Sequence, residues 1–180
     1  ALRNTKVPKK LIVIGSGYIG CELGHAYGGL GSEVHIITRS ELIKREDKDV
    51  RKEFTKVFSK LYNIHQFSPT KVSFKDGTFT VSGKDKSGKK KSIKGDALLV
   101  ATGVKPNTDD LGLDKTSIHV NKKGFIEVNN FLETAVPEVY ALGDCIGRNL
   151  FRHAVNFEGE TLFENLYVKK QKKAIKYPPM

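Results

Sequence analysis

Leu11-Ile-Val-Ile-Gly15-Ser-Gly17-Tyr-Ile-Gly20-Cys-Glu22 decides the fold of this chain, because a short apolar run leads directly into Gly-x-Gly-x-x-Gly. The pattern predicts a strand, a tight turn and a helix. Gly15 makes the turn, Gly17 lets a pyrophosphate approach the backbone, and Gly20 lets the helix pack closely on the strand. The first N–H groups of the helix and its dipole attract an anion. We therefore expect a bound dinucleotide.

The sequence on both sides of this motif fits a nucleotide-binding βαβ unit of about 30 residues. A strand is expected over 10–14, a helix over 18–29 that ends at Gly31, and a second strand over 33–38. Asp47 or a neighbour then caps a second helix. The alternative is a glycine-rich structural turn without a ligand, since the motif alone matches many such turns. The flanking strands and helix favour the dinucleotide site.

Beyond residue 70 the helical pattern gives way to short segments of β-forming residues. They predict an antiparallel meander with turns at Asp76-Gly77 and around Gly88, and with strands over 71–74, 78–82 and 92–94. The apolar run 97–103 predicts a buried strand that returns to the main sheet. The fold class is therefore α/β, with a Rossmann-like dinucleotide-binding βαβ unit and an antiparallel β-meander.

A polar, turn-rich segment over 105–110 marks a domain boundary, which we place between 1–108 and 109–180. In the second domain we expect strands over 124–128 and 138–144 and a helix over 153–167. Residues 169–173 and 177–180 are expected to form a basic tail that enters a linker.

The composition is that of an ordinary globular protein, with 38% hydrophobic and 28% charged residues in a chain of 180. No apolar run approaches the roughly 20 residues of a membrane helix, and the first residues do not resemble a signal peptide. The net charge of +11 suits a lysine-rich solvated surface or a nucleic-acid binder. The basic residues are dispersed, and the densest run, 84–94, lacks aromatic residues for base stacking. We expect no nucleic-acid partner, no membrane partner and a cytoplasmic location.

The two cysteines, Cys21 and Cys145, are far apart in the sequence and form neither a C-x-x-C motif nor a metal-ligand spacing. We expect both to be reduced, buried thiols, and we expect no metal. A redox role for either thiol is the less favoured alternative.

The residues after the second strand select between the two nicotinamide coenzymes. NAD sites place an acidic residue there for the ribose 2′-hydroxyl, whereas NADP sites use arginine for the 2′-phosphate. This chain has Thr38 in place of the acid, and then three residues suited to a phosphate dianion: Arg39, Ser40 and Arg45. The pattern favours NADP(H) over NAD(H). Glu41 and Glu46 favour the reverse, and each arginine is also typical of a surface loop.

Three motifs follow one another along almost the whole chain. The first spans 14–22, the second is Leu99-Val-Ala-Thr-Gly-Val-Lys-Pro-Asn107, and the third is Val139-Tyr-Ala-Leu-Gly-Asp-Cys145 with His153-Ala-Val-Asn-Phe-Glu-Gly159 after it. In this order and spacing they resemble the pyridine nucleotide-disulfide oxidoreductases, flavoenzymes that include dihydrolipoamide dehydrogenase, glutathione reductase and mercuric reductase. Residues 38–47 look most like the NADPH-using mercuric reductase branch.

The resemblance implies roles for residues of the dinucleotide site. Tyr18 matches a ring that covers the flavin where nicotinamide stacks, and Glu22 matches a carboxylate that orients the nicotinamide side of the site through a lysine elsewhere in the family fold. The other residues implied to contact the coenzyme are Gly15, Gly17, Ile19, Gly20, Arg39, Ser40, Arg45, Val72 and Gly103. Val72 matches a position where adenine packs. The alternatives are an aromatic residue packed on the sheet for Tyr18, a solvated helix residue for Glu22 and a core residue for Val72.

The resemblance also implies part of an FAD site in the second domain. Asp144 matches an aspartate that hydrogen-bonds the ribityl chain of FAD, although an aspartate after a glycine also caps helices. The segment that matches a helix start facing the flavin ring consists of Phe151, Arg152, His153 and Ala154. His153 is placed near the flavin edge, and no proton transfer is assigned to it.

Several parts of the family pattern are missing from this sequence. The family begins with its own FAD-binding glycine motif and a Cys-x4-Cys redox pair, and it ends with a dimerisation domain. We therefore expect this chain to be the middle of a longer, homodimeric enzyme: the NAD(P)-binding domain plus the C-terminal part of the FAD-binding domain. Val104 stands where an arginine is common, which puts one nucleotide contact in doubt.

The implied parent enzyme passes a hydride from NAD(P)H to FAD and then electrons to a disulfide or a metal-bound thiolate. The isolated chain is expected to bind NADP(H), to bind FAD weakly and to show no turnover. The alternative is a stand-alone dinucleotide-sensing domain that regulates a partner.

Overall fold

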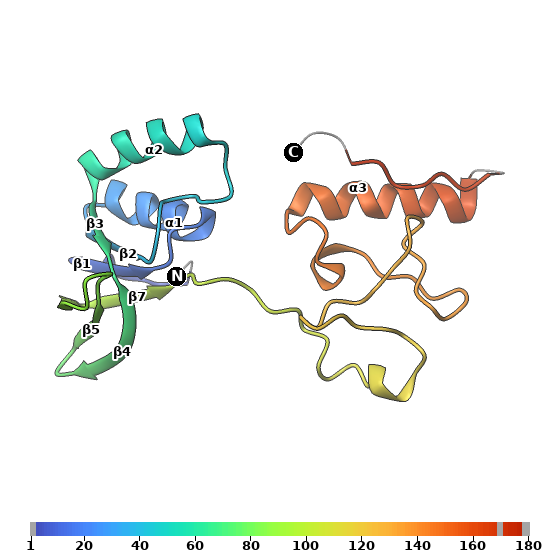
Figure 1. Ribbon diagram of the computed structural model, residues 1–180. Coiled ribbons are helices and arrows are strands. Elements are labelled where there is room, and N and C mark those ends of the chain that lie inside the picture. The colour runs from blue at the N-terminus through green and yellow to red at the C-terminus, as the bar shows by residue number, and fades with distance from the viewer. Residues whose placement is uncertain (1–2, 169–170, 178–180) are drawn as a thin grey trace. The chain divides into compact units, whose positions relative to one another are not determined.

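The computed structural model describes residues 3–168 and 171–177, and the chain divides into two compact units, Ala1–Gly103 and Val104–Met180 (Figure 1). The boundary lies five residues before the one expected at 108. Pro106 and Thr108 belong to the second unit because both are buried there, and the Thr108 hydroxyl donates to the carbonyl of Gly124 (2.7 Å).

The first unit is built on a parallel sheet of order β3-β2-β1-β7, formed by β1 (Lys10–Ile14), β2 (Glu33–Thr38), β3 (Asn63–Gln66) and β7 (Ala97–Val100). Helices α1 (Tyr18–Gly29) and α2 (Lys48–Leu61) lie over one face of it, and the meander lies over the other (Figure 1). Successive residues of β1 alternate between these two layers. Leu11 and Val13 join the core under the helices, whereas Ile12 and Ile14 join the core under the meander.

The ends of both helices follow from local chemistry. Gly31 follows α1 with φ of 99°, a left-handed conformation that glycine adopts without a Cβ penalty. Asp47 caps α2, because its carboxylate accepts from the backbone N–H of Asp49 (2.8 Å) and Val50 (3.4 Å). The predicted β1–α1–β2 unit and the cap of α2 are confirmed.

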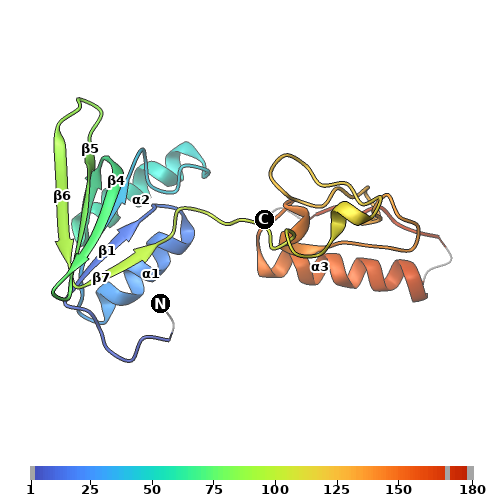
Figure 2. The same cartoon turned by 90° about the horizontal axis from the view of Figure 1, so that it is seen from below.

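The meander is confirmed as an antiparallel sheet of β4 (Ser68–Lys75), β5 (Thr78–Lys84) and β6 (Lys90–Gly95), side by side in Figure 2. Asp76 (φ 47°) and Gly77 (φ 73°) both have positive φ in the tight turn that joins β4 to β5. This backbone geometry is typical of a two-residue hairpin turn, in which the first position favours Asn or Asp and the second favours glycine.

The strand expected over 97–103 returns to the main sheet as predicted, where β7 pairs with β1. It is shorter than expected because β7 stops at Val100, and the expectation that it is buried is wrong because β7 forms the edge of the sheet. Its residues are therefore only half-buried, and Val100 is 61% exposed. A continuous apolar run is typical of a parallel strand covered on both faces, and here one flank of the strand stays open.

The strand β3, which the sequence did not predict, brings two histidines together. The ring of His35 in β2 stacks on His65 in β3, with His35 Nδ1 2.8 Å from His65 Nε2, and His35 Nε2 lies 2.7 Å from a carboxylate oxygen of Glu33. Burial lowers the pKa of His65, and the nearby positive charges of His35, Lys10 and Lys91 lower it further.

The lowered pKa of His65 predicts that the first unit loses stability as the pH falls. The unfolded chain takes up a proton near the ordinary histidine pKa of about 6.5, whereas the folded chain resists it, so stability is complete above that pH and declines below it. Urea unfolding midpoints measured between about pH 7 and pH 5 should fall in the native chain and change less in His65→Gln. His119→Gln removes an exposed histidine and should keep the native slope; equal slopes for all three chains would contradict the prediction.

The second unit contains the helix α3 (Arg152–Phe163), which continues as a π-helix over Glu164–Val168, and two 3₁₀ helices, η1 (Leu113–Lys115) and η2 (Gly143–Ile146). The helix expected over 153–167 is confirmed. The core of this unit comprises Ile126, Leu132, Ala141, Ile146 and Ile175.

The strands expected over 124–128 and 138–144 are wrong. These segments form only single bridges, Val120 with Ile126 and Glu133 with Tyr140. A strand needs a continuous ladder of backbone hydrogen bonds with a neighbour, and within the described residues no such neighbour runs beside either segment.

The basic tail is also different from its prediction where the structure describes it. Residues 171–177 fold back on the second unit, and Ile175 is buried in the core with its N–H donating to the carbonyl of Asn130 (2.8 Å). The many basic residues of this segment gave no indication that Ile175 is buried. Positions 169–170 and the expected linker residues 178–180 lie outside the described residues.

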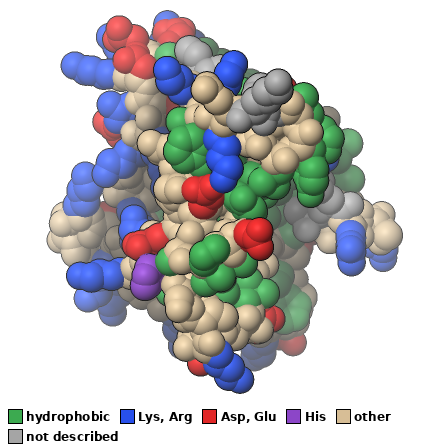
Figure 3. Space-filling view, turned by 90° about the vertical axis from the view of Figure 1, so that its right-hand side faces the viewer, with side chains coloured by type: hydrophobic (Ala, Val, Ile, Leu, Met, Phe, Trp, Pro, Cys, Tyr) green, Lys and Arg blue, Asp and Glu red, His purple; other side chains and the backbone are tan. Residues whose placement is uncertain are grey.

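Basic side chains are dispersed over the surface as expected. Figure 3 shows Lys and Arg scattered among acidic and apolar side chains on the face in view. Among the helices of the described chain, none is both long and apolar enough to span a membrane.

Candidate functional site

The glycine turn is tightly packed on its inner side. A Cβ on Gly15 would lie 2.2 Å from the carbonyl oxygen of Ala101, and its φ of 113° is itself a glycine conformation. A Cβ on Gly20 would lie 2.2 Å from the carbonyl oxygen of Gly15. Only glycine at both positions lets α1 pack against the turn and lets β1 and β7 end side by side.

The outer side of the same turn is open. Gly17 is the exposed N-cap of α1, and a Cβ placed on it would meet no atom within 4 Å. Gly103, just past β7, is also exposed with the same free space. No side chain of the described residues caps the N-terminus of α1, so the positive end of the helix faces this opening.

This opening lies where ligands bind in open α/β sheets. The chain leaves β1 toward β2 on one side, and β7 pairs with β1 on the other, so the strand order reverses beside β1. The crevice at the carboxyl ends of the strands at such a reversal accepts a dinucleotide. The structure thus brings Gly15, Gly17 and Gly103 to one edge of the sheet.

The loop that follows β2 is fixed to the glycine turn through Ser16. The Ser16 hydroxyl lies 2.7 Å from that of Thr38 and donates to the carbonyl of Glu41 (3.3 Å), while the Ser16 carbonyl accepts from the N–H of Ile43 (2.8 Å). Leu42 and Ile43 are buried in the helix-side core. Residues 39–46 are therefore held at the same edge of the sheet as the glycine turn.

The acidic residues of this loop pair with other residues and not with Arg39. Glu41 is paired with Arg51 of α2, and Glu46 accepts a hydrogen bond from the hydroxyl of Tyr18. Arg39 is exposed and has no hydrogen bond or ion pair with any residue in 3–168 or 171–177. The two acids that counted against a phosphate site thus have partners of their own.

Ser40 and Arg45, the other two residues predicted to suit a phosphate, lie on the same loop as Arg39. Ser40 is half-buried, with its N–H donating to the hydroxyl of Thr38 (3.2 Å) and its carbonyl accepting from the amide of Gln66 (3.3 Å). Arg45 is exposed beside Tyr18, where its charge lowers the phenol pKa slightly against the larger effects that raise it.

The three side chains predicted near the start of α1 are all exposed. Tyr18 is 40% exposed, so part of its ring is accessible, and Ile19 is 54% exposed. Glu22 lies one helical turn after Tyr18 and is exposed. The hydrogen bond to Glu46 raises the pKa of Tyr18, so its hydroxyl stays protonated at neutral pH.

Val72 lies in the meander and not on the parallel sheet. It pairs with the buried Val81 across β4 and β5, yet Val72 itself is 46% exposed. The alternative of a simple core residue is therefore wrong for Val72.

The flavin-related residues of the second unit lie around the start of α3. The 3₁₀ helix η2 holds the exposed Asp144, and Gly143 before it packs so closely on α3 that a Cβ would lie 2.8 Å from Val155 Cγ2. The ring of Phe151, the N-cap of α3, stacks on that of His153 with centroids 5.4 Å apart.

The four predicted residues at the start of α3 differ in accessibility. Phe151, Arg152 and His153 are exposed, whereas Ala154 is 1% exposed and its N–H donates to the carbonyl of Phe151 (3.0 Å). The buried side chain of Ala154 leaves only backbone groups of that residue for a cofactor, and the predicted role of the helix start stays a prediction.

The sequence reasoning missed Glu158, a fully buried carboxylate on α3. It lies one turn after the buried Ala154, and Asn165 continues the same inward stripe two turns later. That helical spacing was the available signal, because a charged residue on a buried helix face needs a specific partner.

Both cysteines are free thiols. Burial raises the pKa of Cys21 to about 11 and also raises that of Cys145, so both stay protonated at neutral pH. In the described part of the chain, no three His, Cys, Asp or Glu side chains gather as a metal site requires.

Comparison with known proteins gives the family of this fold. Residues 1–160 match the model of the family described as pyridine nucleotide-disulphide oxidoreductase. The chain is 38% identical over 169 residues to a dihydrolipoyl dehydrogenase of Buchnera aphidicola, covering 91% of this chain and 35% of that protein. It is 35% identical over 170 residues to a leghemoglobin reductase of Glycine max, covering 92% of this chain and 32% of the relative.

A solved structure agrees with these relatives. The HOCl-induced flavoprotein disulfide reductase RclA of Escherichia coli superposes with a TM-score of 0.85 at 25% identity, over 96% of this chain and 39% of that one. This chain therefore spans about a third of the length of the proteins it matches. Because the family model matches residues 1–160, the chain belongs to the pyridine nucleotide-disulphide oxidoreductase family.

Proposed function

We propose that this chain is the part of a flavin-dependent disulfide oxidoreductase that binds the nicotinamide coenzyme and one portion of FAD. The observation that supports this most directly is the glycine turn. Its inner side admits only glycine at Gly15 and Gly20, while its outer side at Gly17 is open next to the helix N-terminus. A packed turn with an open face is the cradle that a pyrophosphate requires.

The chemistry of such an enzyme is hydride transfer from NAD(P)H to FAD, which the two cofactors supply when bound. The chain's own residues would bind and orient them. The backbone around Gly17 would hold the pyrophosphate, Arg39 the adenosine end, and Tyr18 and Glu22 the nicotinamide end. Asp144 would accept hydrogen bonds from the ribityl hydroxyls of FAD, and the start of α3 would face the flavin.

The acceptor beyond FAD is proposed to be a disulfide, in line with the family's description. We propose that the reacting cysteines and the homodimer contact of the parent enzyme lie outside the third of its length that this chain matches. The chain alone is proposed to bind nucleotide without turnover, so NADPH oxidation with FAD and a dithiol-disulfide acceptor by the isolated chain would contradict the proposal. The alternative of a stand-alone sensing domain gains no support from the family match.

We further propose that the coenzyme is NADP(H). Thr38 replaces the acid that binds a ribose 2′-hydroxyl, and its hydroxyl is used internally by Ser16. Arg39 is exposed and unpaired among the described residues, whereas Glu41 and Glu46 are already paired. A phosphate placed beside Arg39 would gain a charge-assisted hydrogen bond with little competition.

Arg39→Ala should weaken NADPH binding by roughly 10- to 100-fold, because one hydrogen bond to a charged group contributes about 1.5–3 kcal/mol. NADH lacks the 2′-phosphate, so its affinity should stay within about twofold of the native value. Titration calorimetry with both coenzymes measures this difference.

The matched control is Lys44→Ala, which removes an exposed cation from the same loop. It should leave the ratio of the two affinities unchanged. If the native chain binds NADH more tightly, or if Arg39→Ala weakens both coenzymes equally, the NADP(H) proposal is wrong.

A further inference from the structure

Glu158 is the most deeply buried acidic residue of the second unit, with a relative exposure of 0%. Its two carboxylate oxygens have different partners. One accepts the backbone N–H of Gly143 (2.5 Å), and the other accepts the hydroxyl of Tyr177 (2.5 Å). A buried carboxylate is tolerated only when such donors compensate for its lost hydration, so neither partner is incidental.

The first partner of Glu158 belongs to the turn that contains Asp144. Gly143 has φ of 77° and packs against Val155 of α3, so the turn has little freedom on that side. The bond from Gly143 to Glu158 fixes the residue immediately before Asp144 to the middle of α3. The position of Asp144 therefore depends on where this carboxylate lies.

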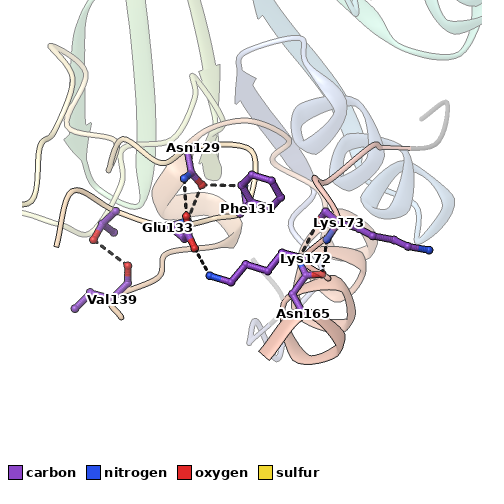
Figure 4. Close-up of polar contacts among 8 residues, drawn as sticks. Asn129, Phe131, Glu133, Val139, Asn165, Lys172 and Lys173 are labelled. Carbon is purple, nitrogen blue, oxygen red and sulfur yellow. Dashed lines mark hydrogen bonds and ion pairs between the residues drawn. The ribbon is translucent and has the colours of Figure 1, made fainter. Parts of the chain in front are cut away.

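The second partner of Glu158 belongs to the segment 171–177 that folds back on the unit. Figure 4 shows two attachments of this segment: Lys172 ion-pairs with Glu133, and the side chain of Asn165 exchanges two hydrogen bonds with the backbone of Lys173 (2.8 Å each). The buried Ile175 is a third attachment, and Tyr177 is the fourth.

The Tyr177 hydroxyl is well suited to hold this carboxylate. Burial and the bond to Glu158 raise the pKa of Tyr177 to about 12, so the hydroxyl remains a donor at neutral pH. Arg148, which lies beside that hydroxyl, is fixed in turn by donating to the carbonyls of Val128 (2.7 Å) and Asn129 (2.8 Å).

We infer that Glu158 and Tyr177 are positioning residues that hold the Gly143–Asp144 turn in its flavin-binding shape, an inference that rests on the proposed FAD role of Asp144. Tyr177 of the segment 171–177 holds the Glu158 carboxylate, and this carboxylate in turn holds the N–H of Gly143. FAD affinity is then linked to the single hydrogen bond between the Tyr177 hydroxyl and Glu158.

The test compares two variants of the 180-residue chain with the native one. Tyr177→Phe removes only the hydroxyl and keeps the ring, which packs near Phe157, so the unit should stay folded. Glu158→Gln keeps the shape of the side chain but removes its charge. The amide oxygen can accept one of the two hydrogen bonds, and the amide nitrogen cannot accept the other. Amide hydrogen exchange of Gly143, resolved by NMR, reports the turn, and quenching of flavin fluorescence reports FAD binding.

We expect Tyr177→Phe to speed the exchange of the Gly143 amide roughly tenfold and to weaken FAD binding roughly three- to tenfold. Glu158→Gln should have the larger effect on both. Lys172→Ala removes an exposed ion pair of the same segment, and Ile175→Val trims its buried side chain by one methyl group, while both keep the Tyr177 hydroxyl and Glu158. Neither control should change Gly143 exchange relative to its neighbours.

Three outcomes decide the inference. Unchanged Gly143 exchange in Tyr177→Phe and Glu158→Gln would overturn it, and so would an equal response in Ile175→Val, because the effect would then follow general stability. If no chain binds FAD while Tyr177→Phe still speeds Gly143 exchange, the proposed flavin role is wrong and the positioning by Glu158 is supported.

Discussion

Gly17→Val is expected to weaken dinucleotide binding by roughly 100-fold or more while the first unit stays folded. The backbone of Gly17 is extended, with φ of −79° and ψ of −175°, which valine adopts readily. Apart from its neighbours in the chain, no atom lies within 4 Å of the added Cβ, so the new side chain starts in open space. The new methyl groups would occupy the space in which the pyrophosphate must approach the backbone.

The measurement combines calorimetric titration of NADPH and NADH with urea unfolding. Both coenzymes should lose affinity alike, because they share the pyrophosphate. Replacing an N-cap glycine by valine should cost about 1 kcal/mol or less of stability. Gly29→Val makes the same chemical change at the other end of α1, where space is also free, and should leave binding unchanged. Native affinity in Gly17→Val would show that the open side of the turn is not a nucleotide site.

Gly20→Ala is expected to destabilise the first unit by about 2–4 kcal/mol. The added Cβ would lie 2.2 Å from the carbonyl oxygen of Gly15, and that oxygen belongs to backbone that cannot rotate away. Helix α1 must therefore move off β1, which loosens the buried contacts between Cys21 and the neighbouring strands.

Urea unfolding of the native chain and the variant measures the loss directly. Gly29→Ala is the matched control, because it adds the same methyl group within α1 at an open position and should stabilise the helix by up to about 1 kcal/mol. If Gly20→Ala is as stable as the native chain, the close packing of the helix on the glycine turn is not what fixes this glycine.

The β1–α1–β2 unit and the start of α2 could be predicted from the sequence, because hydrophobic pattern, glycines and helix caps all indicate the same elements there. The apolar run of β1, the glycines after it and the cap at Asp47 each predict the same boundaries that the structure has. β3 was not accessible, because Asn63-Ile-His-Gln66 is short and mostly polar. Its strand geometry comes from pairing with β2 rather than from its own residues.

The second unit was harder to predict for a related reason. Residues 124–128 and 138–144 have β-forming side chains. A strand also needs a neighbouring strand to pair with, and the β-propensity of a segment does not show whether such a strand is present. The helix α3 was predictable from its own periodicity. The return of the chain at Ile175 depends on one apolar residue in a basic segment, which is too weak a pattern to detect.

The candidate site residues could be named from the sequence, whereas the contacts that connect them could not. Arg39 and the glycines follow from the motif and the strand that precedes them. The pairing of Glu41 with Arg51, of Glu46 with Tyr18 and of Gly143 with Glu158 joins residues 10 to 28 positions apart. Such contacts depend on tertiary structure, so the sequence left the acids near Arg39 as an open alternative.

The attachment of the loop 39–46 to Ser16 has a consequence for how such proteins diversify. The loop is held by backbone groups, by Thr38 and by two buried aliphatic side chains, and none of these is the side chain of Arg39. An exchange at position 39 therefore leaves the scaffold intact. If the proposed role of Arg39 is right, single mutations at this position change the coenzyme preference without loss of the fold.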